Sequence, residues 1–354
     1  MNNVPPSTIE HLSNEIFLMI FSYFFHPELC KAWTGLNFRI DCLVRSIRTC
    51  LHISYNSDLR KYADYMRNWG DMIISLGDYR DDFENEFDDY AIYIKPIDLR
   101  PFINLRKFTQ KHITRKGFNQ ITLINLPYLE RFHISNYDVG YSCRPIDSIL
   151  FNQNQFPCLV SVTGVFIEDI DEKDTTTNSI IHHIGITTSH SSTSATALLK
   201  FINRFPNLVS LRCKVDQFTA TSEPSSVLTK IHKMRLQVVD KDTFHQIEVL
   251  LKSSPVTRIY LEIGAMGYWH GYLEANALVR LAQILNTCQS LTHVDLRIWN
   301  VSDKINIEEI RQLSRWFVPL NINRDITTRK SSWETCASQG LNGRYRYSWK
   351  PAFE

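Results

Sequence analysis

A six-residue pattern that recurs along most of the chain limits what this sequence can fold into. The pattern is apolar-x-x-apolar-x-apolar, and successive copies begin 22 to 35 residues apart. Its clearest copies start at Leu129, Ile181, Leu208, Ile231, Val256 and Leu291, and weaker ones start at Leu105 and Leu159. The alternating apolar residues that end each copy are typical of a strand with one buried face. A short strand cannot bury that face alone, so the copies must stack on one another.

Helical periodicity fills three of the intervals between copies. Apolar residues recur with a period near 3.6 in Ala195–Phe205, Phe244–Leu251 and Leu273–Leu285. Strand and helix therefore alternate, and we expect an α/β fold with parallel strands on the concave face of an irregular solenoid and helices outside. The spacing resembles that of leucine-rich repeats, without the Asn that usually closes their turn. A compact, doubly wound α/β domain stays open as the alternative, because the same alternation fits it.

A second feature is an apolar run near the start of the chain. From Ile16 to Phe25 only Ser22 is polar. Such a helix is apolar on nearly every face, and a segment of about forty residues cannot bury so much apolar surface on itself. The surplus must therefore meet either the rest of the chain or a partner.

These residues resemble an F-box. The family pattern begins with Leu-Pro-x-Glu-Ile and continues through Ile-Phe-Ser-Tyr to an acidic-Leu pair, and here Ser13 stands where the family usually has Pro. Both residues suit the start of a helix. The matching residues are Leu12, Glu15, Ile16, Ile20, Phe21, Ser22, Tyr23, Phe24, Glu28, Leu29, Ala32, Trp33, Leu36, Arg39 and Leu43.

The resemblance implies a function. F-box proteins with leucine-rich-like repeats are substrate-recognition subunits of SCF-type cullin–RING ubiquitin ligases, which direct ubiquitin-dependent protein degradation. The F-box docks on a Skp1-type adaptor, which links to the cullin, and the repeats hold the substrate protein. Such a subunit has no catalytic residues and acts by positioning its substrate. Carried over by position, the adaptor-binding residues would be Leu12, Ile16, Ile20, Phe21, Leu29 and Trp33.

A repeat scaffold outside any ligase is the rival interpretation, and in it the N-terminal helices merely cap the solenoid. A cap needs one apolar face, whereas an adaptor-binding helix needs two. On either interpretation we expect three parts: residues 1–48 as the F-box-like module, 49–104 as a connecting region with the first irregular repeats, and 105–354 as the repeats with a C-terminal cap. The first two strands are expected at Leu51–Ile53 and Met72–Leu76.

The strand pattern also predicts which side chains leave the core. Residues between and after the apolar positions should point out from the concave sheet. The candidate substrate-binding residues are Arg131, Arg212, Lys214, Lys233, Arg235, Arg258, Tyr260, His293 and Arg297, with His133, Glu262 and Asp295 among them. Seven of these twelve residues are Lys or Arg, which favours an acidic or phosphorylated partner. The alternative is that exposed strand positions merely carry solubilising charge.

Composition and motif content narrow the remaining classes of function. The net charge of +2 argues against a generic nucleic-acid binder, and only 12 glycines disfavour phosphate-cradling loops. No hydrolase, nucleotide-binding or metalloprotease motif occurs, and His182, His183 and His190 lack zinc-ligand spacing. We therefore expect no enzyme activity, cofactor or metal site. Without a secretory signal or a membrane-spanning run, and with 8 scattered cysteines, a cytoplasmic or nuclear location is expected.

Several stretches are expected to connect these units or to close them. The acidic stretch Asp78–Asp89 and the polar stretches Asp169–Thr177 and Thr187–Thr196 are expected as loops. The stretch Gly264–Tyr272 is either a partner-binding rim or an ordinary loop. The basic, aromatic end that begins at Arg344 is expected to cap the last repeat.

Overall fold

A computed structural model gives the fold of the chain. The structure describes residues 9–54, 59–79, 97–110, 120–134, 151, 155–166, 177–187, 192–215, 217–219, 230–238, 244–252, 254–263, 275–298, 307–317 and 321–322. The acidic stretch from residue 80 onward, Gly264–Tyr272, His190 and the end that begins at Arg344 lie outside the described residues.

The molecule combines parallel strands with helices, so the α/β class expected from the sequence is confirmed. Its helical segments are η1 (Ile9–His11), α1 (Asn14–Phe21), α2 (His26–Trp33), α3 (Phe38–Ser46), α4 (Leu59–Trp69), η2 (Gly70–Met72), α7 (Ala195–Ile202), α8 (Phe244–Lys252), α9 (Ala275–Thr287), α10 (Ile307–Leu313) and η5 (Arg315–Phe317). Its strands are β1 (Thr49–Ser54), β2 (Ile73–Tyr79), β3 (Lys107–Gln110), β4 (Arg131–Ile134), β5 (Ser161–Phe166), β6 (His183–Thr187), β7 (Ser192–Ser194), β8 (Ser210–Val215), β9 (Gln217–Thr219), β10 (Lys233–Val238), β11 (Arg258–Ile263), β12 (His293–Ile298) and β13 (Asn321–Ile322).

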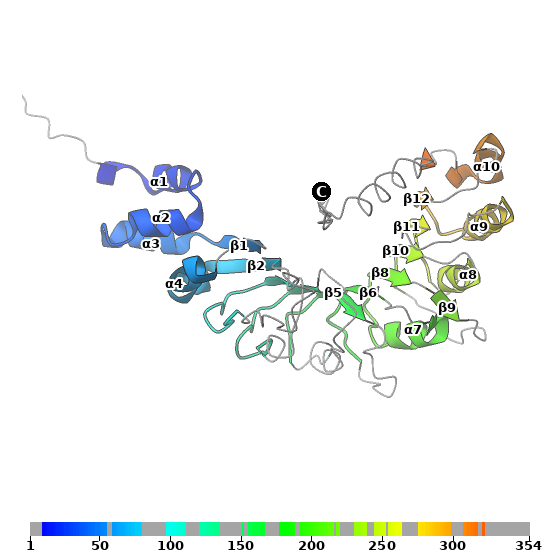
Figure 1. Ribbon diagram of the computed structural model, residues 1–354, viewed down its shortest axis with the longest axis horizontal. Coiled ribbons are helices and arrows are strands. Elements are labelled where there is room, and N and C mark those ends of the chain that lie inside the picture. Colours follow the sequence, from blue (N-terminus) through cyan, green and yellow to red (C-terminus); the bar gives the residue numbers. More distant parts are fainter. Residues whose placement is uncertain are drawn as a thin grey trace, which may run out of the picture.

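One large sheet organises the molecule. Among the described residues it has eleven strands in the order β1-β2-β3-β4-β5-β6-β8-β10-β11-β12-β13, and neighbouring strands pair in parallel throughout. The order follows the chain and never reverses, whereas a doubly wound sheet reverses at its switch point. Figure 1 shows the result, a curved arrangement in which the strands of the sheet line the inner side. The doubly wound alternative does not fit this order.

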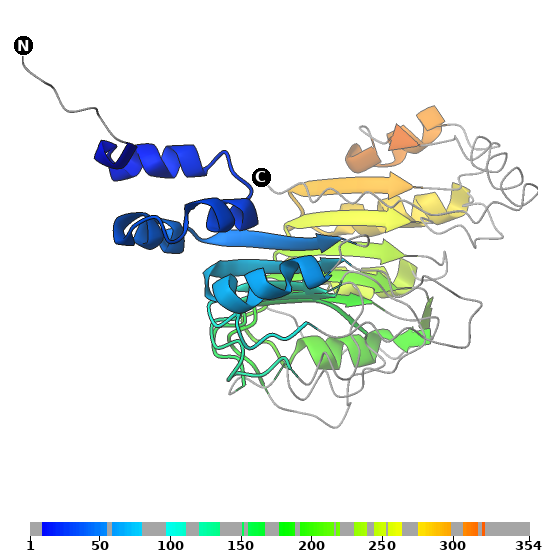
Figure 2. The same ribbon diagram turned by 60° about the vertical axis from the view of Figure 1, so that its left-hand side comes forward.

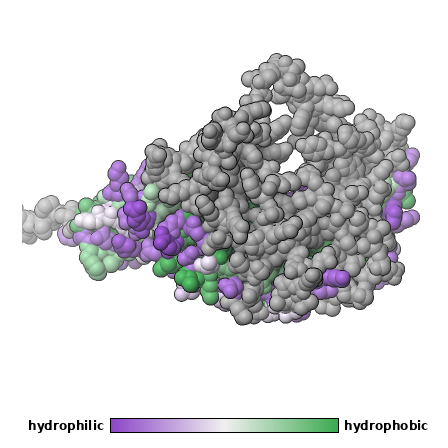
Figure 3. Space-filling model, turned by 60° about the horizontal axis from the view of Figure 1, so that its bottom comes forward, coloured by the Kyte–Doolittle hydropathy of each residue, from purple (hydrophilic) through white to green (hydrophobic). Residues whose placement is uncertain are grey.

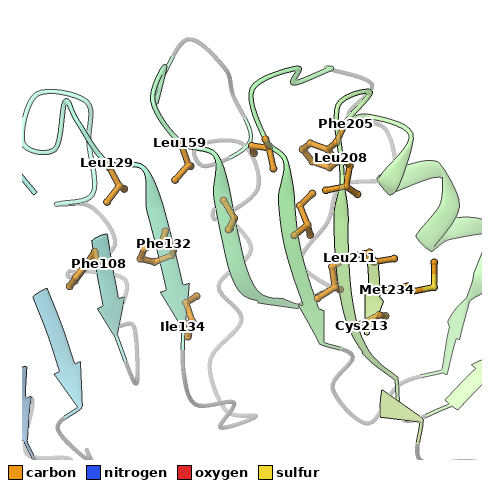
Figure 4. Close-up of a cluster of buried hydrophobic side chains, with 14 of the residues drawn as sticks. Phe108, Leu129, Phe132, Ile134, Leu159, Phe205, Leu208, Leu211, Cys213 and Met234 are labelled. Atoms are coloured by element: carbon orange, nitrogen blue, oxygen red, sulfur yellow. The ribbon is translucent and has the colours of Figure 1, made fainter. Parts of the chain in front are cut away.

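The repeated sequence pattern explains where the strands lie. In all eight copies the strand begins two residues after the first apolar residue, as in Leu129 before Arg131 of β4 and Leu208 before Ser210 of β8. The second and third apolar residues then lie inside the strand and face the core. They stack from strand to strand, and Figure 4 shows Phe108, Phe132, Leu211 and Met234 in this arrangement. Neighbouring strands pair these positions directly: Phe108 with Phe132, and Leu211 with Met234.

Helices cover the outer side of the second half of the sheet. Helices α7, α8 and α9 occupy the stretches that helical periodicity predicted, and they lie in chain order behind β8, β10, β11 and β12 (Figure 1). Their apolar residues, such as Leu198, Ile247 and Leu281, are buried against the sheet. We call the other side of the sheet, opposite these helices, the open face.

The first two strands lie where the sequence predicts them, but a short strand occupies part of an expected loop. Strands β1 and β2 occupy the two positions predicted for them. Strand β2 pairs with β3, so one sheet spans the expected boundary between residues 104 and 105. The expectation of a loop over Thr187–Thr196 is wrong in part. Residues Ser192–Ser194 form β7, which pairs with β9 in a separate two-stranded sheet, and Ala195 begins α7.

Strand β5 carries an irregularity at a glycine. Its register with β6 shifts between Thr163 and Val165, so Gly164 is an extra residue that bulges from the ladder. Gly164 has a φ of +92° and lies against β4, where an added Cβ would come within 2.2 Å of the carbonyl oxygen of Ile134. Both features require glycine at this position.

Candidate functional site

The N-terminal module (α1, α2 and α3) is built around aromatic side chains. Phe17 and Phe21 of α1 are fully buried, and Trp33 of α2 meets them edge-on at centroid distances of 6.1 and 5.1 Å. Arg39 of α3 fixes the start of α1, because its Nη2 donates to the Leu12 carbonyl oxygen at 2.6 Å and its guanidinium lies 5.4 Å from the Phe17 ring centroid. Three short helices thereby share one small core.

Local capping explains where these helices begin. The Asn37 side chain accepts a hydrogen bond from the Ile40 amide at 2.9 Å, which caps α3. Pro27 lies in the first turn of α2, where its missing amide costs nothing. Ser13 takes the N-cap position of α1, as expected, but its side chain makes no capping hydrogen bond to the helix.

The module is joined to α4 by two side-chain contacts, the first of which is buried. The Nδ1 atom of His26 lies 2.7 Å from the hydroxyl oxygen of Tyr65 in α4, and the Arg45 guanidinium lies 4.5 Å from the Trp69 ring centroid. Burial lowers the pKa of His26 and raises the pKa of the Cys30 thiol to about 12. One apolar core runs from the module into the sheet, so residues 1–48 cannot be removed without uncovering α4 and β1.

The outer surface of the module is unusually apolar. Of the thirteen large hydrophobic side chains that are exposed in the described part of the chain, nine fall between residues 9 and 38. Figure 3 shows part of this surface as a green area at the N-terminal end of the molecule, beside white and purple residues. The nine are Ile9, Ile16, Leu18, Met19, Tyr23, Phe24, Phe25, Leu36 and Phe38. A patch of this kind marks an interaction surface in soluble proteins.

A hollow of about 300 Å³ lies where the module meets β1. Its lining includes Leu18, Phe25, Ile47 and Cys50, and His26 borders it. The Nε2 atom of His26 is buried and has no hydrogen-bond partner among the described residues.

The six residues that the resemblance assigned to adaptor binding are divided between surface and core. Ile16 is exposed, whereas Leu12, Ile20 and Trp33 are partly buried against the core. Phe21 and Leu29 lie in the core with 2% and 1% exposure, so they present almost no surface to a partner in this conformation. They shape the module instead.

Sequence reasoning missed the most exposed apolar residues of the module. Met19, Tyr23 and Phe38 are 60%, 85% and 84% exposed. The unbroken apolar run from Ile16 to Phe25 contained part of the signal, because the surplus it predicted had to lie on an outer face. The sequence alone did not say which residues form that face.

The open face of the sheet brings most of the candidate substrate-binding residues together. Strand register sets Arg212 beside Arg235 and Arg235 beside Tyr260, while Lys233 lies beside Arg258 and Arg258 beside His293. Lys214 and Arg297 are further along their strands, paired with Gln237 and Glu262. Arg131 lies apart from these residues on β4, with β5 and β6 between it and β8.

Contacts on the open face hold several of these groups in place. The Arg235 guanidinium lies 4.3 Å from the Tyr260 ring centroid, and the Tyr260 hydroxyl donates to Glu262 Oε2 at 3.3 Å. His133 Nδ1 lies 2.6 Å from Thr163 Oγ1. Burial, and after it the positive charges of Arg212 and Lys107, lower the pKa of His133 to about 4. This histidine is therefore neutral at pH 7 in a positively charged environment.

Two further basic residues belong to the same face. Lys107 of β3 and His183 of β6 occupy the third position of their copies of the repeated pattern, as Arg131 and Lys233 do. The rule that selected the other residues would have found them if it had been applied to the copies at Leu105 and Ile181.

Comparisons with known proteins add no identity. No protein-family model matches the sequence, and no curated protein matches it. Within the described ranges, no group of three or more His, Cys, Asp or Glu side chains is arranged to hold a metal ion. Among the same residues, no helix has both the length and the apolar character needed to cross a membrane.

Proposed function

We propose that the chain is the substrate-recognition subunit of an SCF-type ubiquitin ligase, with an F-box-like module that docks on a Skp1-type adaptor and a leucine-rich-like solenoid that holds the substrate. The apolar outer surface of α1, α2 and α3 is the observation that carries the proposal. A module that served only as a cap would need its inner face alone. Here the inner face is already occupied by Phe17 and Phe21, and Ile16 and Met19 of the same helix remain exposed.

The sequential parallel sheet supports the second half of the proposal. A sheet face that none of the described helices covers offers a long surface for another protein, as solenoids do. In this function the chain supplies no reacting group. It raises the concentration of substrate lysines near the ubiquitin-charged enzyme that the cullin recruits.

The rival function, a repeat scaffold outside any ligase, has one observation in its favour. The module shares its core with α4 and β1, so it covers the edge of the first strand as a cap does. Capping uses the buried side chains of the module and docking uses its exposed ones, so substitutions of exposed residues distinguish the two functions.

The experiment is co-expression with a Skp1-type adaptor and a cullin, followed by size-exclusion chromatography. Deletion of residues 1–48 would uncover the core, so the test uses the double variant Ile16→Asp/Met19→Asp. Ile124→Asp is the matched control, because Ile124 is 90% exposed and far from the module in the chain. Exposed apolar anchors dominate interfaces, and their loss weakens binding by about tenfold or more each.

We expect the wild type and Ile124→Asp to elute with the adaptor and the double variant to elute alone as a folded protein. If the wild type does not co-elute with the adaptor, the ligase proposal is wrong and the scaffold function is favoured. Co-elution of the double variant at wild-type strength would mean that this surface is not the adaptor interface.

A further inference from the structure

The first residues of eight successive strands form a line across the open face. Backbone register pairs each with the next, from β3 through β4, β5, β6, β8, β10 and β11 to β12. We call this line the basic row, and its members are Lys107, Arg131, Ser161, His183, Ser210, Lys233, Arg258 and His293. The six basic side chains are all exposed, and the serines are half-buried.

The row contains hydrogen-bond donors and cations without a single carboxylate. Cations are immediate neighbours at two places, Lys107 with Arg131 and Lys233 with Arg258. Adjacent strands are about 4.8 Å apart, and like charges directly opposite one another are destabilising. Among the described residues none of these four side chains forms an ion pair. The nearby Glu130 is already paired with Arg106, at 3.1 Å.

The field of the row acts on the histidine at its centre. Although His183 is exposed as a residue, partial desolvation of its imidazole is the main cause that lowers its pKa, and the positive charges of His182, Arg131 and Lys233 lower it further. Charges on both sides of β6 therefore add at this point. An anion bound along the row would relieve this repulsion.

We propose that the basic row binds an extended peptide segment that carries two phosphate groups, one at Lys107 and Arg131 and the other at Lys233 and Arg258. The proposal rests on the proposed function, in which the open face holds the substrate protein. A phosphate carries a charge near −2 and three acceptor oxygens, so one phosphate neutralises two adjacent cations. A carboxylate neutralises only one.

Strand geometry sets the spacing of the two phosphates. The two cation pairs are centred five strand intervals apart, which is about 24 Å along the sheet. An extended peptide rises about 3.3 Å per residue, so the phosphorylated residues are separated by about seven positions. Ser161 and Ser210 lie between the pairs and offer hydroxyl donors to the peptide.

A peptide fits the row better than a single-stranded nucleic acid does. Binding of single strands relies mainly on large aromatic side chains on which bases stack, and the row contains no Phe, Tyr or Trp. The nearest aromatic residue described on the face, Tyr260 in the next row, is covered by the Arg235 guanidinium.

The test measures binding of labelled synthetic peptides to the full chain by fluorescence anisotropy. The probe is a Gly/Ser peptide with two phosphoserines seven positions apart, and its comparisons are the singly phosphorylated, Glu-substituted and unphosphorylated peptides. A single-stranded RNA of equal charge is the competitor. We expect the doubly phosphorylated peptide to bind about tenfold tighter than each comparison peptide, and its affinity to fall as salt rises.

Substitutions then locate the site. Lys233→Ala and Arg258→Ala should each weaken binding about tenfold. Lys200→Ala on α7 and Arg280→Ala on α9 are matched controls, because both residues are exposed on the helical side, and these should change binding by less than about twofold. The proposal is overturned by equal affinity for phosphorylated and unphosphorylated peptides, by equal losses in the control variants, or by RNA that binds as tightly at the same residues. Because no adaptor is present, a failure to bind the adaptor does not affect this measurement.

Discussion

At the scale of single residues, His133 illustrates how the open face controls ionisation. Its imidazole lies half-buried between Thr109 and Thr163, and Arg212 and Lys107 act on it from neighbouring strands. In the unfolded chain a histidine titrates near pH 6.5, whereas the pKa in the folded protein is about 4. The unfolded state therefore binds a proton between these values that the folded state does not bind.

This difference in protonation lowers the free energy of unfolding as the pH falls. The contribution of neutral His133 to stability is fully present above the unfolded pKa, and it is lost as the pH falls from about 6.5 towards 4. Between pH 7 and pH 5 this residue should cost about 2 kcal/mol of unfolding free energy. The variant His133→Gln keeps a hydrogen-bond partner for Thr163 but cannot titrate. Between pH 7 and pH 5 we expect its unfolding free energy, measured by urea unfolding, to fall by about 2 kcal/mol less than that of the wild type. Parallel pH profiles for the wild type and the variant would contradict the prediction.

At the scale of elements, strand β5 depends on one backbone conformation. Gly164→Ala would combine a strained positive φ with a Cβ 2.2 Å from the Ile134 carbonyl oxygen. We expect a loss of about 3 kcal/mol or more in unfolding free energy. Gly35→Ala is the control, because Gly35 also has a positive φ of +79° but nothing lies within 4 Å of its added Cβ. It should cost about 1 kcal/mol, and equal losses in the two variants would show that the contact with β4 is unimportant.

The elements also show how far the sequence predicts this fold. The repeated pattern predicted eight strands and the 3.6-residue periodicity predicted three helices, because burial on one side of an element leaves a regular spacing of apolar residues in the sequence. It could not reveal the extra residue at Gly164, which depends on how β5 approaches β4. In α1 the apolar residues surround the helix, so periodicity could not separate the buried Phe21 from the exposed Met19. That separation depends on tertiary packing against Trp33 and on the neighbouring helices.

At the scale of the whole molecule, the sequential strand order makes interactions local. In the described part of the chain, each strand of the large sheet bonds only to its neighbours in that order, and α7, α8 and α9 contact one another in sequence. Stability is then approximately a sum over units and their interfaces. Removal of one complete unit should leave the remaining interfaces intact.

Deletion of residues 231–255 tests this. It removes β10 and α8 together and joins Lys230 to Val256, so that Ser210 of β8 would face Arg258 of β11 in the register that β10 now provides. We expect a folded protein with cooperative thermal unfolding by circular dichroism. Deletion of residues 231–238 alone removes the strand and leaves α8 with Ile247 and Leu250 uncovered, so this variant should aggregate. The idea fails if the two deletions behave alike.

The strand order also determines how the molecule would respond to mechanical load. In Figure 2 the arrows of the large sheet run side by side in one direction, and the end strands β1 and β13 are each bonded to a single neighbour among the strands that the structure describes. A pull on the chain ends would strip an end strand first and leave the next one equally weakly held. Stretching should therefore unfold the protein in a series of small steps at similar force, without one dominant unfolding event.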